Sequence, residues 1–378
     1  MKIADLIDAM QRIAPPELAE PWDNVGLLMG SRDAELSGPV LLTIDLTEAV
    51  AAEACRLQCG AVIAYHPPIF EPIKQITCAT ETGRVALKLL RAGIAVYSPH
   101  TALDAAPNGM TDWLAEGLLG PKDAGGGGDR RALRSHAELP RTQQLKVVTF
   151  APMEKLDDLR KAMATAGAGI IGGYEVCSFS AAGHGTFFGG EGTRPALGEA
   201  GRLETVVEHR LEMVCSRDAL ALVLETLRRF HPYEEPAIDV YELTERPHRA
   251  AGAGRRITLD HAATLDELAT RLKAHLGVKS VKIAPASDEP IDRIGVCPGA
   301  GGSLVPLALK AGCQLFVTGE MKHHELRAAT ADGLSVMLAG HTQTERPFLK
   351  LLAPRLSEQL GGAQVLVSTE DREPWLAR

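Results

Sequence analysis

Two segments that lie far apart in this chain follow one pattern, and this repetition constrains the fold more than any other feature. Residues 92–104 and 332–345 both pass through a glycine turn and an apolar, strand-like run, and both then read His-Thr-x-x-carboxylate. An internal duplication with a long insertion between its halves is the simplest explanation. The chain is therefore expected to contain two related lobes.

Strand-like and helix-like stretches alternate around both segments. In the first half, strands are predicted over 40–46, 61–64 and 94–97, and helices over 47–58 and 83–92. In the second half, strands are predicted over 293–297, 315–318 and 335–338, and helices over 303–311 and 323–330. This alternation favours β-α-β units with largely parallel sheets, so both lobes are predicted to be α/β.

Two stretches rich in glycine and charged residues divide the chain. Residues 123–144, which contain four consecutive glycines, and residues 244–255 are predicted to be linkers without packed structure. They delimit a first α/β lobe at 1–122, an insert at 145–243 and a second α/β lobe at 256–378.

The insert differs from the two lobes in its predicted strands and helices. A strand is predicted over 145–150 and helices over 153–166 and 219–230, with a glycine-rich stretch at 167–201 between the helices. This pattern indicates a small α+β sandwich of the ferredoxin-like kind.

Composition narrows the class of protein. The 378 residues carry 40 Lys and Arg against 48 Asp and Glu, a net charge of -8, which argues against a general nucleic-acid or anionic-membrane binder. The apolar runs are strand-sized, and the first ten residues carry two acids, so neither a membrane span nor a signal peptide is expected. The seven cysteines form no CxxC pair, so reduced thiols and no cysteine metal site are expected. We expect a cytoplasmic protein.

Three predicted strands end beside a histidine, which is where open α/β sheets bind ligands. His66 follows one strand, and the pairs His100 with Asp104 and His341 with Glu345 follow two others. If a helical turn begins at each of these two histidines, each pair lies on one face with Cβ atoms about 5–6 Å apart. A single His-x-x-x-Asp is usually a surface pair or a cap, but the second copy favours a shared metal site. Three imidazoles and two carboxylates exceed the needs of one tetrahedral ion, so two divalent ions are inferred; these donors suit Zn, Fe, Mn or Co.

Several motifs occur together in the order of one known family. Residues 22–28 (WDNVGLL), 65–70 (YHPPIF), 98–104, 318–324 and 341–345 resemble the dinuclear-metal-centre hexameric protein family, also called GTP cyclohydrolase 1 type 2 homologs or NGG-interacting-factor-like proteins. The middle block resembles the CutA-like or PII-like insert of its longer members. The resemblance implies a homohexameric ring with its sites facing an inner cavity.

The same resemblance implies the metal ligands: His66, His100, Asp104, His341 and Glu345, with the acids shared between ions. One position departs from the family pattern, since many members have two adjacent histidines where this chain has Tyr65 before His66. Tyr65 is either a weak phenolate ligand or a residue whose metal gains an extra water.

Four other features near these motifs each allow two interpretations. Glu320 and His324 are either a rim acid and base that shuttle a proton, or parts of a helix start. Asn24 either contacts the substrate or the ligands, or occupies a left-handed turn. Residues 299–302 (GAGG) either cradle a phosphate or form a tight strand-to-helix turn.

The predicted function follows from this site. We expect a metal-dependent hydrolase that acts on a nucleotide or related small molecule, and the family name points to opening of a GTP-type purine ring. The alternative is a non-catalytic metal-binding scaffold or regulator with a ligand-sensing insert. A role in DNA binding has no support in the acidic composition.

Overall fold

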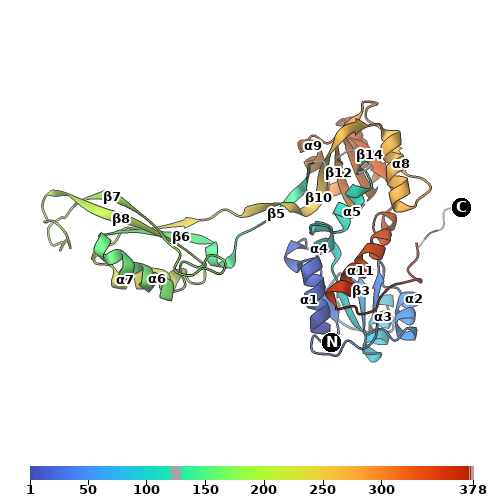
Figure 1. Cartoon of the computed structure of the whole chain (residues 1–378), viewed down its shortest axis with the longest axis horizontal. Coiled ribbons are helices and arrows are strands. Elements are labelled where there is room, and N and C mark those ends of the chain that lie inside the picture. The colour runs from blue at the N-terminus through green and yellow to red at the C-terminus, as the bar shows by residue number, and fades with distance from the viewer. Residues whose placement is uncertain (121–128, 374, 376–378) are drawn as a thin grey trace. The chain divides into compact units, whose positions relative to one another are not determined.

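A computed structural model describes residues 1–120, 129–373 and 375. It has a mixed α/β fold with three sheets in these residues, and the chain forms two compact units (Figure 1). The first unit comprises Met1–His136 with His248–Arg378, and the second comprises Ala137–Pro247. In the described part of the chain, every helix is too short or too polar to cross a bilayer.

The first sheet of unit one has the order β1-β4-β3-β2-β15. Four of its strands are parallel neighbours, and β1 is antiparallel to β4. The strands are β1 Gly26–Met29, β2 Val40–Thr43, β3 Ala61–Ala64, β4 Ala95–Ser98 and β15 Val365–Val367. The helices around it are α1 Ile3–Ile13, α2 Glu48–Arg56, α3 Glu81–Arg91, α4 His100–Ala105 and α11 Leu349–Gln359, whereas α5 Met110–Glu116, which follows α4, packs against the second sheet.

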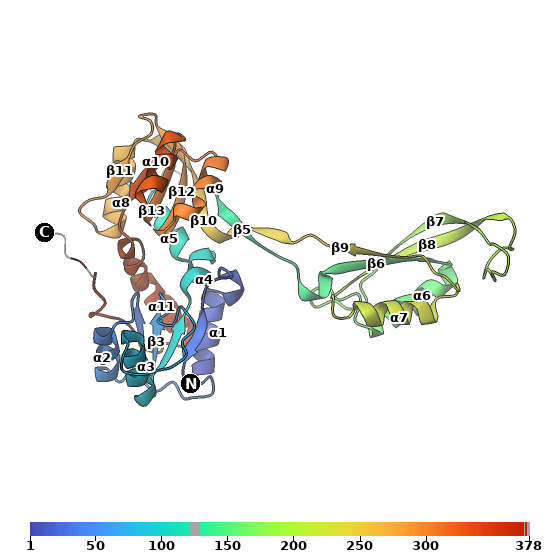
Figure 2. The same cartoon turned by 180° about the vertical axis from the view of Figure 1, so that it is seen from behind.

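Residues of the central strands are buried on both faces, as expected for parallel strands covered by helices. Leu41 and Val62 point into a cluster with α2 and α3, whereas Leu42 and Ile63 point into a cluster with α1 and α11. Figure 2 shows α2 and α3 beside β3 in this unit. The five segments predicted here correspond to within a few residues to β2, α2, β3, α3 and β4.

The second sheet of unit one has the order β11-β14-β13-β12-β10-β5. Strands β12, β13 and β14 are parallel, whereas β11 is antiparallel to β14 and β10 is antiparallel to β12. The strands are β5 Arg130–Glu138, β10 Arg246–Ala263, β11 Lys282–Ala284, β12 Ile291–Ala300, β13 Leu315–Glu320 and β14 Ser335–Leu338. The helices are α8 Leu265–Leu276, α9 Val305–Lys310 and α10 His323–Ala331.

The two sheets of unit one share a hydrophobic core. Ile63 and Tyr97 of the first sheet belong to the same buried cluster as Val317 and Met337 of the second. This continuous core fixes the strand ends of one sheet relative to those of the other, which matters for the site described below.

The predicted linkers are wrong over residues 130–138 and 246–255, because these residues form β5 and much of β10. The glycines there serve close packing: a Cβ on Gly252 would lie 2.1 Å from the carbonyl oxygen of Arg134 on β5. Arg255 is fully buried and gives all of its side-chain donors to Asp112 and to four backbone carbonyls. The four consecutive glycines lie outside the described residues.

The predicted boundary of the second lobe is also wrong at its C-terminal end. Strand β15 pairs with β2 in register Val365 to Val40, so it completes the first sheet rather than the second. Helix α11 likewise packs in the core beside α1. The physical reason is that the open edge of β2 and the apolar face of α1 both need a partner.

Unit two contains the third sheet, which is antiparallel with the order β7-β8-β6-β9. Its elements follow one another as β6 Leu145–Ala151, α6 Leu156–Thr165, β7 Phe179–Phe188, β8 Leu203–Cys215, α7 Leu220–Phe230 and β9 Ile238–Glu242. This succession and order are those of a ferredoxin-like fold. Helices α6 and α7 lie on one face of the sheet, where Val147 and Met213 join their core (Figure 2). The predicted strand and both helices are present, whereas β7 lies in the glycine-rich stretch that gave no strand signal.

Short 3₁₀ turns connect several elements. They are η1 Pro16–Leu18, η3 Arg141–Gln143, η4 Met153–Lys155, η5 Gly302–Leu304, η6 Thr342–Thr344 and η7 Arg346–Phe348.

Candidate metal centre

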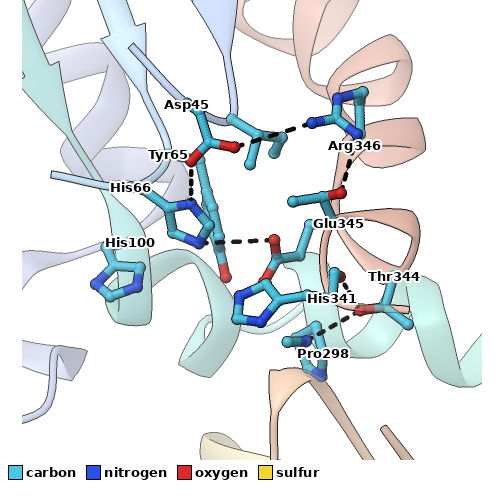
Figure 3. Close-up of polar contacts among 12 residues, drawn as sticks. Asp45, Tyr65, His66, His100, Pro298, His341, Thr344, Glu345 and Arg346 are labelled. Carbon is cyan, nitrogen blue, oxygen red and sulfur yellow. Dashed lines mark hydrogen bonds and ion pairs between the residues drawn. The ribbon is translucent and has the colours of Figure 1, made fainter. Parts of the chain in front are cut away.

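Three of the predicted ligands converge from the carboxyl ends of strands in both sheets of unit one (Figure 3). His66 follows β3, His100 begins α4 after β4, and His341 follows β14. The ring centroids of His66 and His341 are 5.5 Å apart, and those of His66 and His100 are also 5.5 Å apart. The predicted meeting of imidazoles from the two halves is therefore present in the structure.

Glu345 completes a group that could hold a metal ion. The donor atoms of His66, His341 and Glu345 all lie within 4.8 Å of one another. The two oxygens of the Glu345 carboxylate lie 3.6 Å from Nε2 of His66 and 3.5 Å from Nε2 of His341. The carboxylate therefore stands between imidazoles that come from different sheets.

The environment of Glu345 fits a cation. Its side chain is only 2% exposed, and its Oε2 is buried without a hydrogen-bond partner among the described residues. Burial, together with the negative charges of Asp104 and Asp45, raises the pKa of Glu345 well above its ordinary value. A buried carboxylate with an unpaired oxygen is costly, and a bound divalent ion would remove that cost.

Each imidazole is held by a carboxylate on its Nδ1 nitrogen. The three pairs are Asp45 with His66 at 2.9 Å, Asp23 with His100 at 2.7 Å, and Glu320 with His341 at 3.0 Å. A carboxylate on Nδ1 fixes the tautomer and leaves Nε2 free to bind a metal, as is usual for metal-binding histidines.

Two of these supporting carboxylates, Asp23 and Asp45, were not predicted as site residues. Asp23 also accepts a hydrogen bond from the Thr101 amide at 3.1 Å. Burial acts to raise the pKa of Asp23, but the hydrogen bonds from His100 and Thr101 outweigh it and lower the pKa. Asp45 comes shortly after β2. Its position near the carboxyl end of a buried strand is the sequence feature that could have marked it as a site residue.

The helix expected at each His-x-x-x-carboxylate pair forms in one case only. His100 and Asp104 both lie in α4, and His100 has a φ of 25° in the sparsely populated left-handed region. His341 and Glu345 instead flank the 3₁₀ turn η6. The Glu345 carboxylate still reaches back to His341, because the short turn brings the two ends close together.

Tyr65 and Asp104 form a buried pair next to the imidazoles. The Tyr65 hydroxyl donates to Oδ1 of Asp104 at 2.7 Å, and burial raises the pKa of Tyr65 well above its ordinary value. Burial likewise raises the pKa of Asp104 to about 6. The Tyr65 hydroxyl thus contacts Asp104, another residue of the predicted ligand set, and both alternatives given for Tyr65, a weak phenolate ligand or a metal with an extra water, stay predictions.

The two candidate rim residues differ in their contacts. Glu320 lies at the site, because its Oε1 oxygen is 3.0 Å from Nδ1 of His341. Its side chain is 55% exposed. His324 is exposed in the first turn of α10, and in the described residues it has no hydrogen bond or ion pair with the cluster. The predicted role of His324 stays a prediction without a structural contact.

The glycine turn at 299–302 packs against the cluster and is used structurally. A Cβ on Gly299 would lie 2.5 Å from Oε1 of Glu345, and Gly299 has a φ of 59°. The amides of Gly299 and Gly301 already donate to Thr344 and Thr318. The tight-turn interpretation of this motif therefore holds, since these amides are not free for a phosphate.

The fold and this cluster define a class: mixed α/β proteins in which two sheets bring imidazoles and a buried carboxylate together in position to hold a metal ion. The chain belongs to the Duf34/NIF3 (NGG1p interacting factor 3) family, whose model matches residues 1–374. The family resemblance predicted from the sequence motifs is confirmed.

Related proteins cover nearly the whole chain. It is 32% identical over 382 residues to the GTP cyclohydrolase 1 type 2 homolog of Bacillus subtilis, covering 98% of this chain and 97% of that protein. It is 31% identical to NIF3-like protein 1 of Bos taurus, covering 99% and 92%. Among solved structures, a Bacillus cereus protein related to NIF3 matches with a TM-score of 0.66 and 30% identity, covering 100% and 99%. A Staphylococcus aureus protein matches with a TM-score of 0.76 and 26% identity over the same shares.

Proposed function

We propose that this protein is a metal-dependent hydrolase acting on a nucleotide or a related small molecule. The observation that carries the proposal is the Glu345 carboxylate, buried with one unpaired oxygen between His66 and His341. Relatives named GTP cyclohydrolase 1 type 2 homolog support the nucleotide class. The proposal includes two ions per chain, each Zn, Fe, Mn or Co, with His100 and Asp104 as ligands of the second.

The chain's own residues have distinct tasks in this proposal. When bound, a divalent ion supplies Lewis-acid activation of water and substrate. His66 and His341 direct Nε2 toward the centre because Asp45 and Glu320 hold their Nδ1 atoms. Glu320 is exposed enough to meet a substrate or water, so it is the residue we assign to moving a proton at its carboxylate.

The test is turnover combined with metal analysis. Protein purified without added metal is analysed for bound ions and then assayed with GTP and with p-nitrophenyl phosphate in the presence of each candidate ion. We expect metal-dependent turnover that Glu345→Gln abolishes while circular dichroism shows a retained fold. Asp33→Asn, which changes an exposed carboxylate outside the cluster, is the matched control and keeps full activity.

Replacing Glu320 separates the two predicted rim residues. We expect Glu320→Gln to lower turnover by roughly 10²-fold, the usual scale of general acid–base catalysis. His324→Gln is expected to have little effect, because His324 does not contact the cluster. The reverse result would transfer the proton-moving role to His324.

A second candidate function is a non-catalytic metal-binding scaffold whose insert senses a ligand. Unit two contains a cavity of about 680 Å³, lined by residues of β7 and β8, the segment 193–197 and residues 233–237. The insert's element order supports the proposal that it is a CutA-like or PII-like domain. Absence of turnover with every ion, together with a large fall in melting temperature on chelation, would favour this function.

Two further proposals concern the oligomeric state of the protein and the origin of its two lobes. We propose a cytoplasmic homohexamer, supported by the family membership, and two lobes derived by duplication, supported by the parallel strand triplets β2-β3-β4 and β12-β13-β14. Light scattering on the purified full chain tests the hexamer, because it measures the mass in solution directly.

A further inference from the structure

Two exposed aromatic rings lie next to the candidate metal centre. Trp22 is 60% exposed and Phe70 is 47% exposed, and their ring centroids are 6.0 Å apart. Other aromatic side chains of this chain are exposed as well, among them Tyr174 and Phe188, but Trp22 and Phe70 are the exposed pair that lies beside the imidazoles. By contrast, Trp113 is only 6% exposed, within the core.

These rings continue the row of imidazoles. The centroid of Trp22 lies 6.2 Å from that of His100, with the ring planes at 74°. His100 is in turn 5.5 Å from His66, and His66 is 5.5 Å from His341. A ligand stacked on Trp22 would therefore lie close to the imidazoles of the cluster.

The backbone beneath both rings is anchored to the site. Asp23, which follows Trp22, holds Nδ1 of His100 and is completely buried as a side chain. The side-chain amide of Asn24 donates to the carbonyl oxygen of Ile69, next to Phe70, at 2.6 Å. The two rings are exposed although their chain segments are tied to the cluster and to each other. Such an arrangement prepares a surface before a ligand arrives, which lowers the entropy cost of binding.

We propose that Trp22 is a stacking platform for a planar heteroaromatic ring, such as a purine base, of the molecule that binds at the metal centre, and that Phe70, whose ring plane is tilted by 59° to that of Trp22, borders this platform. Stacking of a base on aromatic side chains is favourable and tolerant of the base's identity, because every base presents a π-face. The platform therefore selects for a planar ring without distinguishing one base from another, and the cluster receives the part of the ligand beyond the ring. This inference rests on the proposed function in naming the ligand class, but stacking itself needs no metal and no turnover.

A second copy of the chain is the competing occupant of these rings. Ile73 and Ile76, farther along the segment after Phe70, are also exposed. Trp22 and Phe70 would bury about 150–250 Å² each, so a standard interface of roughly 800 Å² per partner would need Ile73, Ile76 and further exposed residues as well. Trp22 itself lies beside His100, with ring centroids 6.2 Å apart, and this position favours a ligand of the metal centre over a subunit contact.

The test measures ring binding in metal-free protein. The full chain is stripped of metal with a chelator and titrated by calorimetry with guanosine, GTP and ribose 5-phosphate, the last lacking the ring. We expect guanosine and GTP to bind and Trp22→Ala to weaken both by roughly tenfold or more. Trp22→Phe, which keeps a ring, is expected to lose much less, and Phe70→Ala is a second variant if Trp22→Ala fails to fold.

Trp375→Ala is the matched control, because Trp375 is similarly exposed at 58% and lies outside the platform. It is expected to bind guanosine as the wild type does. Equal guanosine affinity in Trp22→Ala and wild type would overturn the inference, as would no binding of either ring ligand to the wild type. A changed solution mass in Trp22→Ala with unchanged guanosine affinity would overturn it in favour of a subunit contact. Ring binding that depends on Trp22 in a protein without turnover would sustain the platform while the hydrolase proposal fails.

Discussion

His66 and His341 belong to different sheets, yet their ring centroids lie 5.5 Å apart with the planes at 65°. The shared core of unit one makes this possible, because it packs the strands that carry these two residues into one body. The Glu345 carboxylate lies between the rings and contacts Nε2 of both. A metal held here would link the two sheets directly, so its binding is expected to depend on each imidazole.

Removing one imidazole tests that dependence. We expect His341→Ala to weaken metal binding by at least roughly tenfold, because it removes a donor atom from the three-residue group. The measurement is ion content after dialysis against graded concentrations of a chelator. His323→Ala, which removes an exposed histidine on α10, is the matched control and is expected to keep its metal. Equal ion content in both variants would contradict the assignment of His341 as a ligand.

The outer carboxylates are expected to matter nearly as much as the ligands. Asp45→Asn keeps the shape of the side chain but removes the charge that orients His66 through Nδ1. Loss of such a partner typically lowers metal affinity by about 10–100-fold. Competition titration with a coloured chelator measures the change. The same substitution at exposed Asp33 should leave the affinity unaltered, and an unaltered value in Asp45→Asn would remove Asp45 from the site.

The buried Arg255–Asp112 pair is expected to be a major contributor to the stability of unit one. Arg255→Ala removes the 2.7 Å partner of the buried Asp112 carboxylate, leaving it the longer ion pair with Arg130 at 3.5 Å, and it also removes the donors to four carbonyls. Breaking a buried pair in this way typically costs about 3–5 kcal/mol of unfolding free energy. Urea denaturation measures the loss. Arg131→Ala, which changes an exposed arginine on β5, is the control and is expected to have little effect on the unfolding free energy. A loss in Arg255→Ala as small as that in Arg131→Ala would contradict the prediction.

Arg255 also shows why part of the fold could not be read from the sequence. Segments rich in glycine and arginine resemble solvated linkers, and only the three-dimensional structure shows that Gly252 allows close strand approach and that Arg255 is buried. The convergence of His66, His100 and His341 was easier to predict, because a histidine after a strand and a repeated His-Thr-x-x-carboxylate are local patterns. Asp45 was harder, since its role depends on where His66 lies in the folded chain, and β15 was missed because its partner β2 is distant in sequence.

The insert is expected to lose stability as the pH falls below about 6.5, because His231 is held in its neutral form. Its Nε2 donates to the Phe150 carbonyl at 3.2 Å, while its Nδ1 accepts from the Tyr233 amide at 3.1 Å. Burial lowers the pKa of His231 below its ordinary value of about 6.5, against smaller raising effects of the Phe150 hydrogen bond and the charge of Glu208. A second proton would place an N–H at Nδ1 against the Tyr233 N–H.

The sign of the effect follows from proton linkage. With a lowered pKa, the folded insert binds fewer protons than the unfolded chain, so the contribution of His231 is fully present above pH 6.5. It is lost as the pH falls from there through the pKa of the folded state. Hydrogen exchange of β6 amides across pH 5–8, corrected for intrinsic exchange rates, measures the stability of the insert. His231→Gln cannot titrate, so it is expected to flatten this pH dependence, whereas His184→Gln on exposed β7 should preserve it. An unchanged slope in His231→Gln would assign the pH dependence to other groups.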